Sequence, residues 1–267
     1  MAEEISDEEK AQYQQMVKAS QDRIDELNAA EKDLLLSAKD DSEEAALAQL
    51  AFADKTLDVI LCLLEVDTVS KRLYNTKNEK ALNEARKIAN KGLACLENVV
   101  TGFVDAPFSD YEGKLAKIAS FDAGQRYQLI EKMKRTIDFL KDAYGKDVKW
   151  KWSFVETDGR LAAVAKNLMD LKKAVANKDP RSPDYEPTLL HLRMIKELMV
   201  YAADRYRERY EMSTNSKDDF KRGIDFLGAL FRIHSLIWEK DDAAMVKKKQ
   251  EAWTAKLNTD IKNKRAR

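Results

Sequence analysis

The stretch that decides the fold runs from Ser42 to Asn75, SEEAALAQLAFADKTLDVILCLLEVDTVSKRLYN, and contains neither glycine nor proline. Its apolar residues recur at helical spacing in two stripes. One stripe is Leu47, Leu50, Leu57, Leu61 and Leu64, and the other is Val59, Cys62, Val66, Val69 and Leu73. A helix with two apolar stripes needs cover on two sides. We therefore predict one helix, about 50 Å long at about 1.5 Å per residue, that is buried along two faces.

Further helices are predicted on both sides of this segment. Residues 6–9 have the Ser-x-x-Glu spacing of a capping box, and an apolar seam over residues 13–34 predicts that a first helix continues to about Ala38. A second capping box at residues 76–79 opens a helix whose apolar face reaches Phe103. The two long helices on either side of position 76 should form a hairpin.

The rest of the chain shows the same helical periodicity. Helices are expected after residue 109, from 121 to 145, through 161–175, and over 187–212, 216–240 and 241–264. The chain holds only 8 Gly and 4 Pro, too few for the turns of a β-sandwich. The fold class is therefore all-α, an elongated assembly of about eight helices in long antiparallel hairpins with no β-sheet.

Three of the four prolines fall within one short stretch, which marks it as a linker. We accordingly expect a long-helix hairpin region at residues 1–177, a Pro-rich linker at 178–187 and a C-terminal helical region at 188–267. Packing of the two regions as a single domain is the alternative.

The residues that carry most catalytic chemistry are scarce, with two His and two Cys. Neither histidine follows a glutamate at the spacing of a di-iron bundle; His191 is expected on a helix surface and His234 in the core. Cys62 and Cys95 should pack as small apolar residues without a disulfide. Because glycine-rich phosphate loops and zinc spacings are absent too, we expect no catalytic residue, cofactor, metal ion or small-molecule substrate. An enzyme with a carboxylate-lined cleft between helices is kept as a third hypothesis.

Two aromatic and basic segments are candidates for protein contacts. Tyr and Arg, which are enriched at interface hot spots, are concentrated at residues 201–210, and aromatics alternate with lysines at residues 149–154. The candidate interface residues are Trp150, Trp152, Phe154, Tyr201, Arg205, Tyr206, Arg209 and Tyr210. An ordinary helix end with half-buried rings is the alternative interpretation of the first segment, and core packing of at least one Trp that of the second.

The charges are unevenly distributed although they balance overall. Residues 1–66 hold 17 acids and 6 bases, so the remainder carries the opposite net charge of +11. Such asymmetry favours self-association or binding to protein partners. The basic stretch 246–267 alone does not indicate nucleic-acid binding, because the chain is neutral overall and has no groove-reading motif.

Sequence signals for the membrane and for secretion are also missing. No apolar run is long enough to cross a bilayer, so no membrane insertion is expected. The first residues lack the pattern of a secretory signal. The protein is expected to be periplasmic if Met1 replaces a removed signal peptide, and cytoplasmic otherwise.

The chain resembles the spirochaete flagellar-coiling proteins, which are helical components of the periplasmic flagellar filament sheath. The resemblance rests on the acidic start at residues 2–9, the long hairpins over residues 6–103 and the aromatic, lysine-rich stretch around residues 150–154. It implies a non-enzymatic subunit that binds the filament core and supports curvature and motility, and it assigns no role to single residues. The alternative function is a cytoplasmic all-helical adaptor that binds one protein partner.

Overall fold

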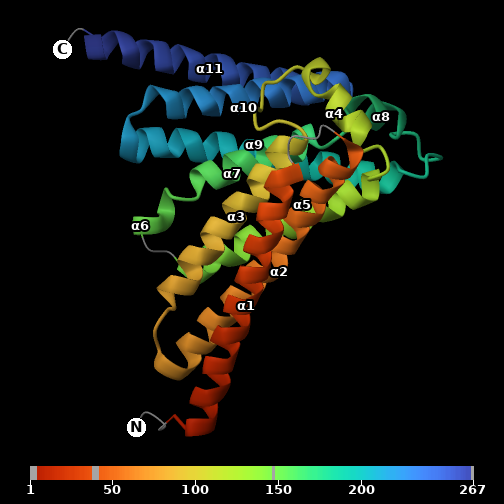
Figure 1. Ribbon diagram of the computed structural model, residues 1–267. Helices are drawn as coiled ribbons and strands as arrows, with labels where there is room; N and C mark the ends of the chain where they lie inside the picture. Colours follow the sequence, from red (N-terminus) through yellow and green to blue (C-terminus); the bar gives the residue numbers. More distant parts are fainter. Residues whose placement is uncertain (1–4, 38–41, 146–147, 266–267) are drawn as a thin grey trace. The chain divides into compact units, whose positions relative to one another are not determined.

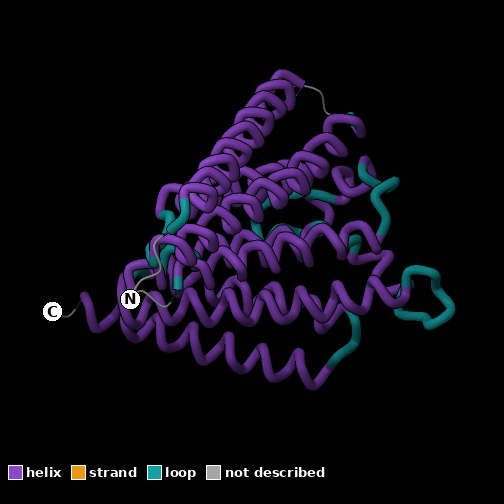
Figure 2. Tube along the Cα trace, turned by 90° about the horizontal axis from the view of Figure 1, so that it is seen from below, coloured by secondary structure: helices purple, strands orange, loops and turns teal. Residues whose placement is uncertain are grey.

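Every regular element of the protein is helical in the computed structural model, which describes residues 5–37, 42–145 and 148–265. Figures 1 and 2 show helices joined by short loops, with no strand in these ranges. The predicted all-α class is confirmed.

Contacts between residues divide the described chain into two compact units. Unit 1 holds the described residues before 100 together with 117–121 and 128–150, and unit 2 holds 100–116, 122–127 and the described residues from 151 onward. The segment 178–187, expected as a linker, therefore lies within unit 2, where Pro180 and Pro183 are part of a series of turns.

Unit 1 is built around the helix that the two apolar stripes predict. Its helices are α1 (Asp7–Ser37), α2 (Glu43–Tyr74), α3 (Glu79–Val99), most of α5 (Ala123–Tyr144) and the start of α6 (Val148–Lys151). Both α1 and α3 pack against α2. Leu50, Leu57 and Leu64 are buried from one stripe, and Val59 and Val66 are buried from the other. The expectation of cover on two sides is confirmed, although Leu61 remains 42 % exposed.

The helix starts of unit 1 follow one predicted cap and depart from another. The Ser6 hydroxyl accepts from the Glu9 N–H at 3.3 Å, and the Glu9 carboxylate accepts from the Ser6 N–H at 3.1 Å, as the capping box predicts. The prediction of a box at Thr76 is wrong. Asn78 caps α3 instead, because its side-chain oxygen accepts from the Ala81 N–H at 3.0 Å.

A buried carboxylate of α2 holds the first turn of α3 in place. Asp67 is 0 % exposed, and its Oδ1 accepts from the Asn78 N–H at 2.8 Å while its Oδ2 pairs with Lys71 at 2.5 Å. Replacing Asp67 with Ala should lower the free energy of unfolding by about 2 kcal/mol, because the part-buried Asn78 N–H loses a charged acceptor. Urea denaturation checks this, with Asp58→Ala on the exposed face of α2 as the matched control. Equal midpoints for the two variants would show that Asp67 is not holding the turn.

Unit 2 is a layer of long antiparallel helices with shorter elements packed beside it. The long helices are α9 (Tyr185–Arg209), α10 (Lys217–Leu236) and α11 (Lys240–Arg265), which lie side by side in Figures 1 and 2. Both α9 and α11 pack against α10, and α7 (Val155–Asn167) packs against α9. The shorter elements are η1 (Phe108–Asp110), α4 (Glu112–Lys117), α8 (Leu171–Ala176) and the π-helical turn η2 (Tyr210–Thr214).

The two histidines both lie in the interior of unit 2. His234 is 7 % exposed, which confirms its expected core position. The prediction that His191 lies on a helix surface is wrong, because it is 2 % exposed and its Nε2–H donates to the Ala165 carbonyl at 3.0 Å. Its neighbours Leu190 and Leu192 are apolar, and α9 turns this face toward α7.

Two further expectations concern cysteine pairing and the membrane. Cys62 and Cys95 are free thiols, and burial raises the pKa of the Cys95 thiol to about 11. The absence of a disulfide between them was expected.

Within the described ranges, no helix combines the length and the apolar character that a bilayer crossing requires.

Candidate functional site

The Tyr- and Arg-rich end of α9 is packed into unit 2. Tyr206 is 2 % and Tyr210 5 % exposed, and Arg209 forms a bidentate ion pair with Asp219 of α10. Of the aromatic residues expected here as contacts, Tyr201 alone is open to solvent, at 45 % exposure. Most of this segment joins the helices of unit 2 to one another.

The Tyr206 hydroxyl lies in a polar network that residue patterns alone do not reveal. It donates to Glu156 of α7 at 3.1 Å, and Arg222 of α10 donates to both oxygens of Glu156 at 2.6 Å. Burial raises the pKa of Tyr206 to about 12, so the ring stays neutral. Gly159 permits this packing, because a Cβ there would lie 2.7 Å from the tyrosine ring.

Arg205 belongs to a second cluster, which contains one of the candidate tryptophans. Trp152 has Lys151 above its ring at 4.6 Å and Arg205 at 5.3 Å. Arg205 also donates to the Lys151 carbonyl at 2.6 Å and pairs with Glu208. Phe154, two residues further on, is 5 % exposed. Trp152 is thus partly covered by its own neighbours.

Trp150 belongs to unit 1, whereas Trp152 and Phe154 belong to unit 2. Its ring is 4.6 Å from that of Tyr144, and the Arg86 guanidinium lies 5.1 Å from it. The aromatic stretch 150–154 therefore does not present its three rings as a single patch of one unit.

The most exposed large apolar side chain in the described residues was absent from the candidates. Trp238 is 79 % exposed and occupies the turn between α10 and α11 with a φ of 64°. The Glu239 N–H donates to the His234 carbonyl at 2.9 Å and the Trp238 N–H to that of Ser235 at 3.3 Å. This is a Schellman motif, with tryptophan at the position that usually holds glycine.

Sequence periodicity placed the end of this helix at Lys240, whereas α10 ends at Leu236. No glycine marks the turn, and the usual signal for a helix end is therefore missing. A left-handed backbone costs a side-chain-bearing residue about 1–2 kcal/mol, so the turn is held by the bonds around it.

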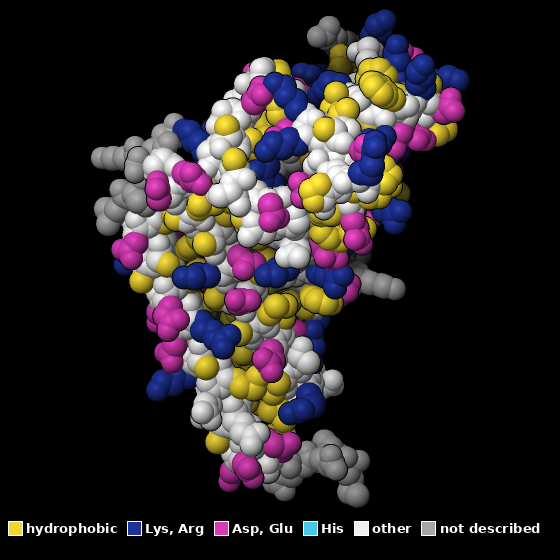
Figure 3. All heavy atoms as spheres, turned by 90° about the vertical axis from the view of Figure 1, so that its right-hand side faces the viewer, with side chains coloured by type: hydrophobic (Ala, Val, Ile, Leu, Met, Phe, Trp, Pro, Cys, Tyr) yellow, Lys and Arg dark blue, Asp and Glu magenta, His cyan; other side chains and the backbone are white. Residues whose placement is uncertain are grey.

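More exposed apolar side chains flank Trp238 along the chain. Leu236 is 40 % and Met245 63 % exposed, and both lie within eight residues of it. Charged residues of both signs, including Lys240 and Asp241, stand between them in the sequence. Figure 3 shows the same mixture of hydrophobic, basic and acidic side chains on one face of the molecule. We call the stretch Leu236–Met245 the α10–α11 corner.

Comparison with known proteins identifies the family. The model of the TP0443 family matches residues 9–261, nearly the whole chain. The chain belongs to the TP0443 family. This family carries a Treponema designation, which fits a spirochaete protein but does not specify flagellar coiling. Neither the curated proteins nor the solved structures give a significant match.

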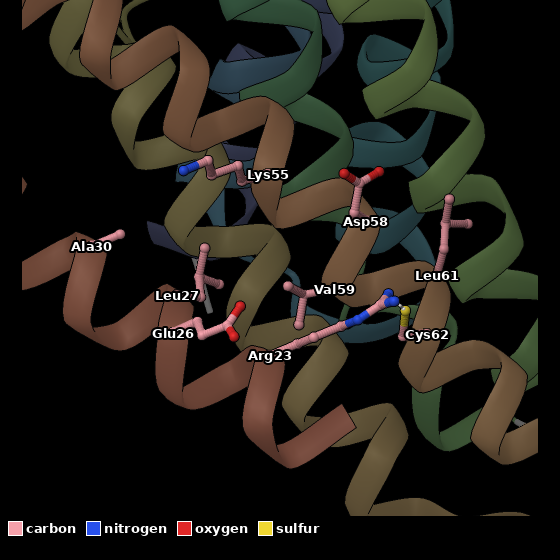
Figure 4. Close-up of a pocket in the computed structure, with 9 residues that line it drawn as sticks. All are labelled: Arg23, Glu26, Leu27, Ala30, Lys55, Asp58, Val59, Leu61 and Cys62. Atoms are coloured by element: carbon pink, nitrogen blue, oxygen red, sulfur yellow. Dashed lines mark hydrogen bonds between the residues drawn. The ribbon is translucent and has the colours of Figure 1, made fainter. Parts of the chain in front are cut away.

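The region matched by the TP0443 family also includes a cavity of about 550 Å³ between α1 and α2 of unit 1. Figure 4 shows Arg23 extending from α1 toward Cys62 of α2, where its Nη1 donates to the Sγ atom. The lining side chains alternate in charge, with Glu26 and Asp58 beside Arg23 and Lys55. These nine lining residues include no histidine and no hydroxyl nucleophile, so they do not form a Ser-His-Asp or Cys-His set.

Among the described residues of this TP0443-family chain, one group of potential metal ligands lies close together. His234, Glu239 and Asp242 each offer an atom within 4.8 Å of the others. All three lie at or beside the α10–α11 corner.

Proposed function

We propose that this protein is a non-enzymatic structural protein that binds a protein partner through the α10–α11 corner. One observation carries the proposal: Trp238 is 79 % exposed on a left-handed backbone. Glycine would remove both the exposed ring and the backbone strain, so folding alone does not favour tryptophan here. Residues in strained conformations cluster at functional sites, and tryptophan is the type most enriched at interface hot spots.

The partner in this proposal is the periplasmic flagellar filament, which the protein covers as a sheath subunit that supports curvature and motility. Two observations support it: the treponemal designation of the family and the resemblance of the chain to flagellar-coiling proteins. Location in the periplasm is part of the same proposal. Leu236 and Met245 would widen the apolar contact around the Trp238 anchor.

Co-sedimentation of the full chain with purified spirochaete flagellar filaments tests the proposal. Trp238→Gly should weaken binding by at least about thirtyfold, the loss typical of a hot-spot side chain. The same variant should be as stable as the original chain or more stable by about 1 kcal/mol, because glycine relieves the strain at this position. Loss of binding would then not be a consequence of unfolding.

Phe139→Ala is the matched control, because Phe139 is a 56 % exposed aromatic on α5 of unit 1. It should leave filament binding unchanged. Filament binding by Trp238→Gly at the original affinity would refute the anchor. Absence of any filament binding, together with recovery of one cytoplasmic protein from source cells, would favour the adaptor instead.

A further inference from the structure

The turn that exposes Trp238 also brings three metal-ligating side chains together. His234 lies in the last turn of α10, and the Schellman motif reverses the chain so that Glu239 returns to it. The His234 Nδ1–H donates to Glu239 Oε2 at 2.6 Å. Glu239 immediately precedes α11 and Asp242 lies in its first turn, so the two carboxylates lie close together at the start of that helix.

The Glu239 carboxylate of this cluster already pairs with a lysine side chain of the protein. The Lys196 ammonium of α9 donates to both oxygens of Glu239, at 3.0 and 3.1 Å.

The cluster combines a packed side chain with an exposed one. His234 is 7 % exposed, so its ring is held by packing, whereas Asp242 is exposed and leaves the cluster open to solvent on one side. A small cation can therefore reach the carboxylates from water.

We propose that His234, Glu239 and Asp242 bind a divalent transition-metal ion of the Zn²⁺ or Co²⁺ type, with displacement of the Lys196 ammonium from Glu239 and of the proton from His234 Nδ1. One imidazole nitrogen with carboxylate oxygens is the mixed donor set that these ions take, whereas Ca²⁺ and Mg²⁺ prefer oxygen alone. Bonds of about 2.0–2.2 Å keep two ligand atoms within about 4.2 Å of each other. The three ligand atoms lie within 4.8 Å of one another, so small side-chain rotations bring them to bonding distance of one ion.

Three protein ligands leave a further position on the ion for water. Lys196 is a competitor in this arrangement, because its ammonium and the metal ion require the same Glu239 oxygens. Removing its charge should strengthen metal binding. A purely structural role for the Lys196–Glu239–His234 cluster makes no such prediction.

Calorimetric titration of the full chain with ZnCl₂, and the visible absorption spectrum of the Co²⁺ form, test the proposal. One ion should bind per chain. Asp242→Asn should weaken binding by at least about tenfold, and His234→Gln should weaken it further. Lys196→Gln should tighten binding by about tenfold, because the competing cation is removed. Asp241→Asn, the neighbouring exposed carboxylate, is the matched control and should leave the affinity unchanged.

Two results would exclude metal binding at His234, Glu239 and Asp242. Absence of ion binding by the original chain would refute the site. Equal affinities for Asp242→Asn and Asp241→Asn would place the metal ion elsewhere, because Asp242 is exposed and its replacement is not expected to unfold the chain. Metal binding goes beyond the proposed function, and it can be refuted without refuting filament binding. Trp238→Gly should keep its metal ion while losing the filament, because glycine preserves the Schellman turn.

Discussion

Asn167→Ala is expected to lower the free energy of unfolding by about 3 kcal/mol, one of the two largest effects that the structure predicts. Asn167 ends α7, is 0 % exposed, and donates through Nδ2 to the carbonyls of Thr101 at 2.7 Å and Phe103 at 3.0 Å. Alanine would remove the fully buried donor of two part-buried hydrogen bonds, and the loss of each such bond costs about 1–1.5 kcal/mol.

The preceding residue holds the next part of the same loop. Lys166 is 4 % exposed and donates from Nζ to the carbonyls of Val104 at 2.9 Å and Ala106 at 3.3 Å. Burial lowers its pKa to about 8. Two consecutive side chains of α7 thus fix residues 101–106 within unit 2, and removal of Asn167 should also release this loop locally.

Urea denaturation and amide hydrogen exchange together measure the effect of Asn167→Ala. The denaturation midpoint should fall, and exchange should accelerate over residues 101–106 in particular. Asn258→Ala, at an exposed position of α11, is the matched control and should change neither quantity. If the two variants denature together, the hydrogen bonds of Asn167 do not stabilise unit 2.

The stability of the protein should fall by about 3 kcal/mol between pH 6.5 and pH 4 because of His191 alone. Burial is the main cause that lowers the pKa of His191 from 6.5 to about 4, and the charge of Arg126 lowers it further. Between these two values, the unfolded chain takes up a proton at His191 that the folded chain does not. Acid therefore favours unfolding in this window, and below about pH 4 the contribution no longer changes.

His191→Gln isolates this contribution. Glutamine keeps an N–H donor for the Ala165 carbonyl but does not titrate. Carboxylates contribute equally to both proteins, so the difference between their unfolding free energies should change with pH only between about 4 and 6.5. A constant difference across that range would mean that His191 is readily protonated in the folded chain.

The sequence was sufficient for the parts of the fold where apolar spacing dominates. The two stripes of α2 predicted its length and its cover on both sides, and Ser6 with Glu9 predicted the start of α1. Thr76 failed as a cap because the last residue before α3, Asn78, supplies the nearer acceptor. The local residue pattern predicts that a helix forms, whereas the residue at which the helix begins depends on hydrogen bonds within one turn.

The candidate site was less accessible to sequence reasoning. His191 was placed on the surface because its helix face was judged from neighbouring residue types, while packing of α9 against α7 decides its burial. Tyr206 and Tyr210 are hot-spot residue types that serve the interior of unit 2 instead. No sequence pattern pointed to Trp238. Glycine is the usual residue at its position in the turn, and a turn without glycine is not recognised from the sequence.

¹⁹F NMR of the chain labelled with fluorotryptophan tests the proposed contact between the exposed Trp238 ring and the filament. The chain has four tryptophans, and the resonance that disappears in Trp238→Phe identifies the one at the corner. In the free protein this resonance should respond to solvent, as expected for a ring that is 79 % exposed. On addition of flagellar filaments it should broaden or shift and lose that response, whereas the resonance of the buried Trp253 should keep its chemical shift. A Trp238 resonance that still responds to solvent in the presence of bound filament would show that Trp238 is not the contact.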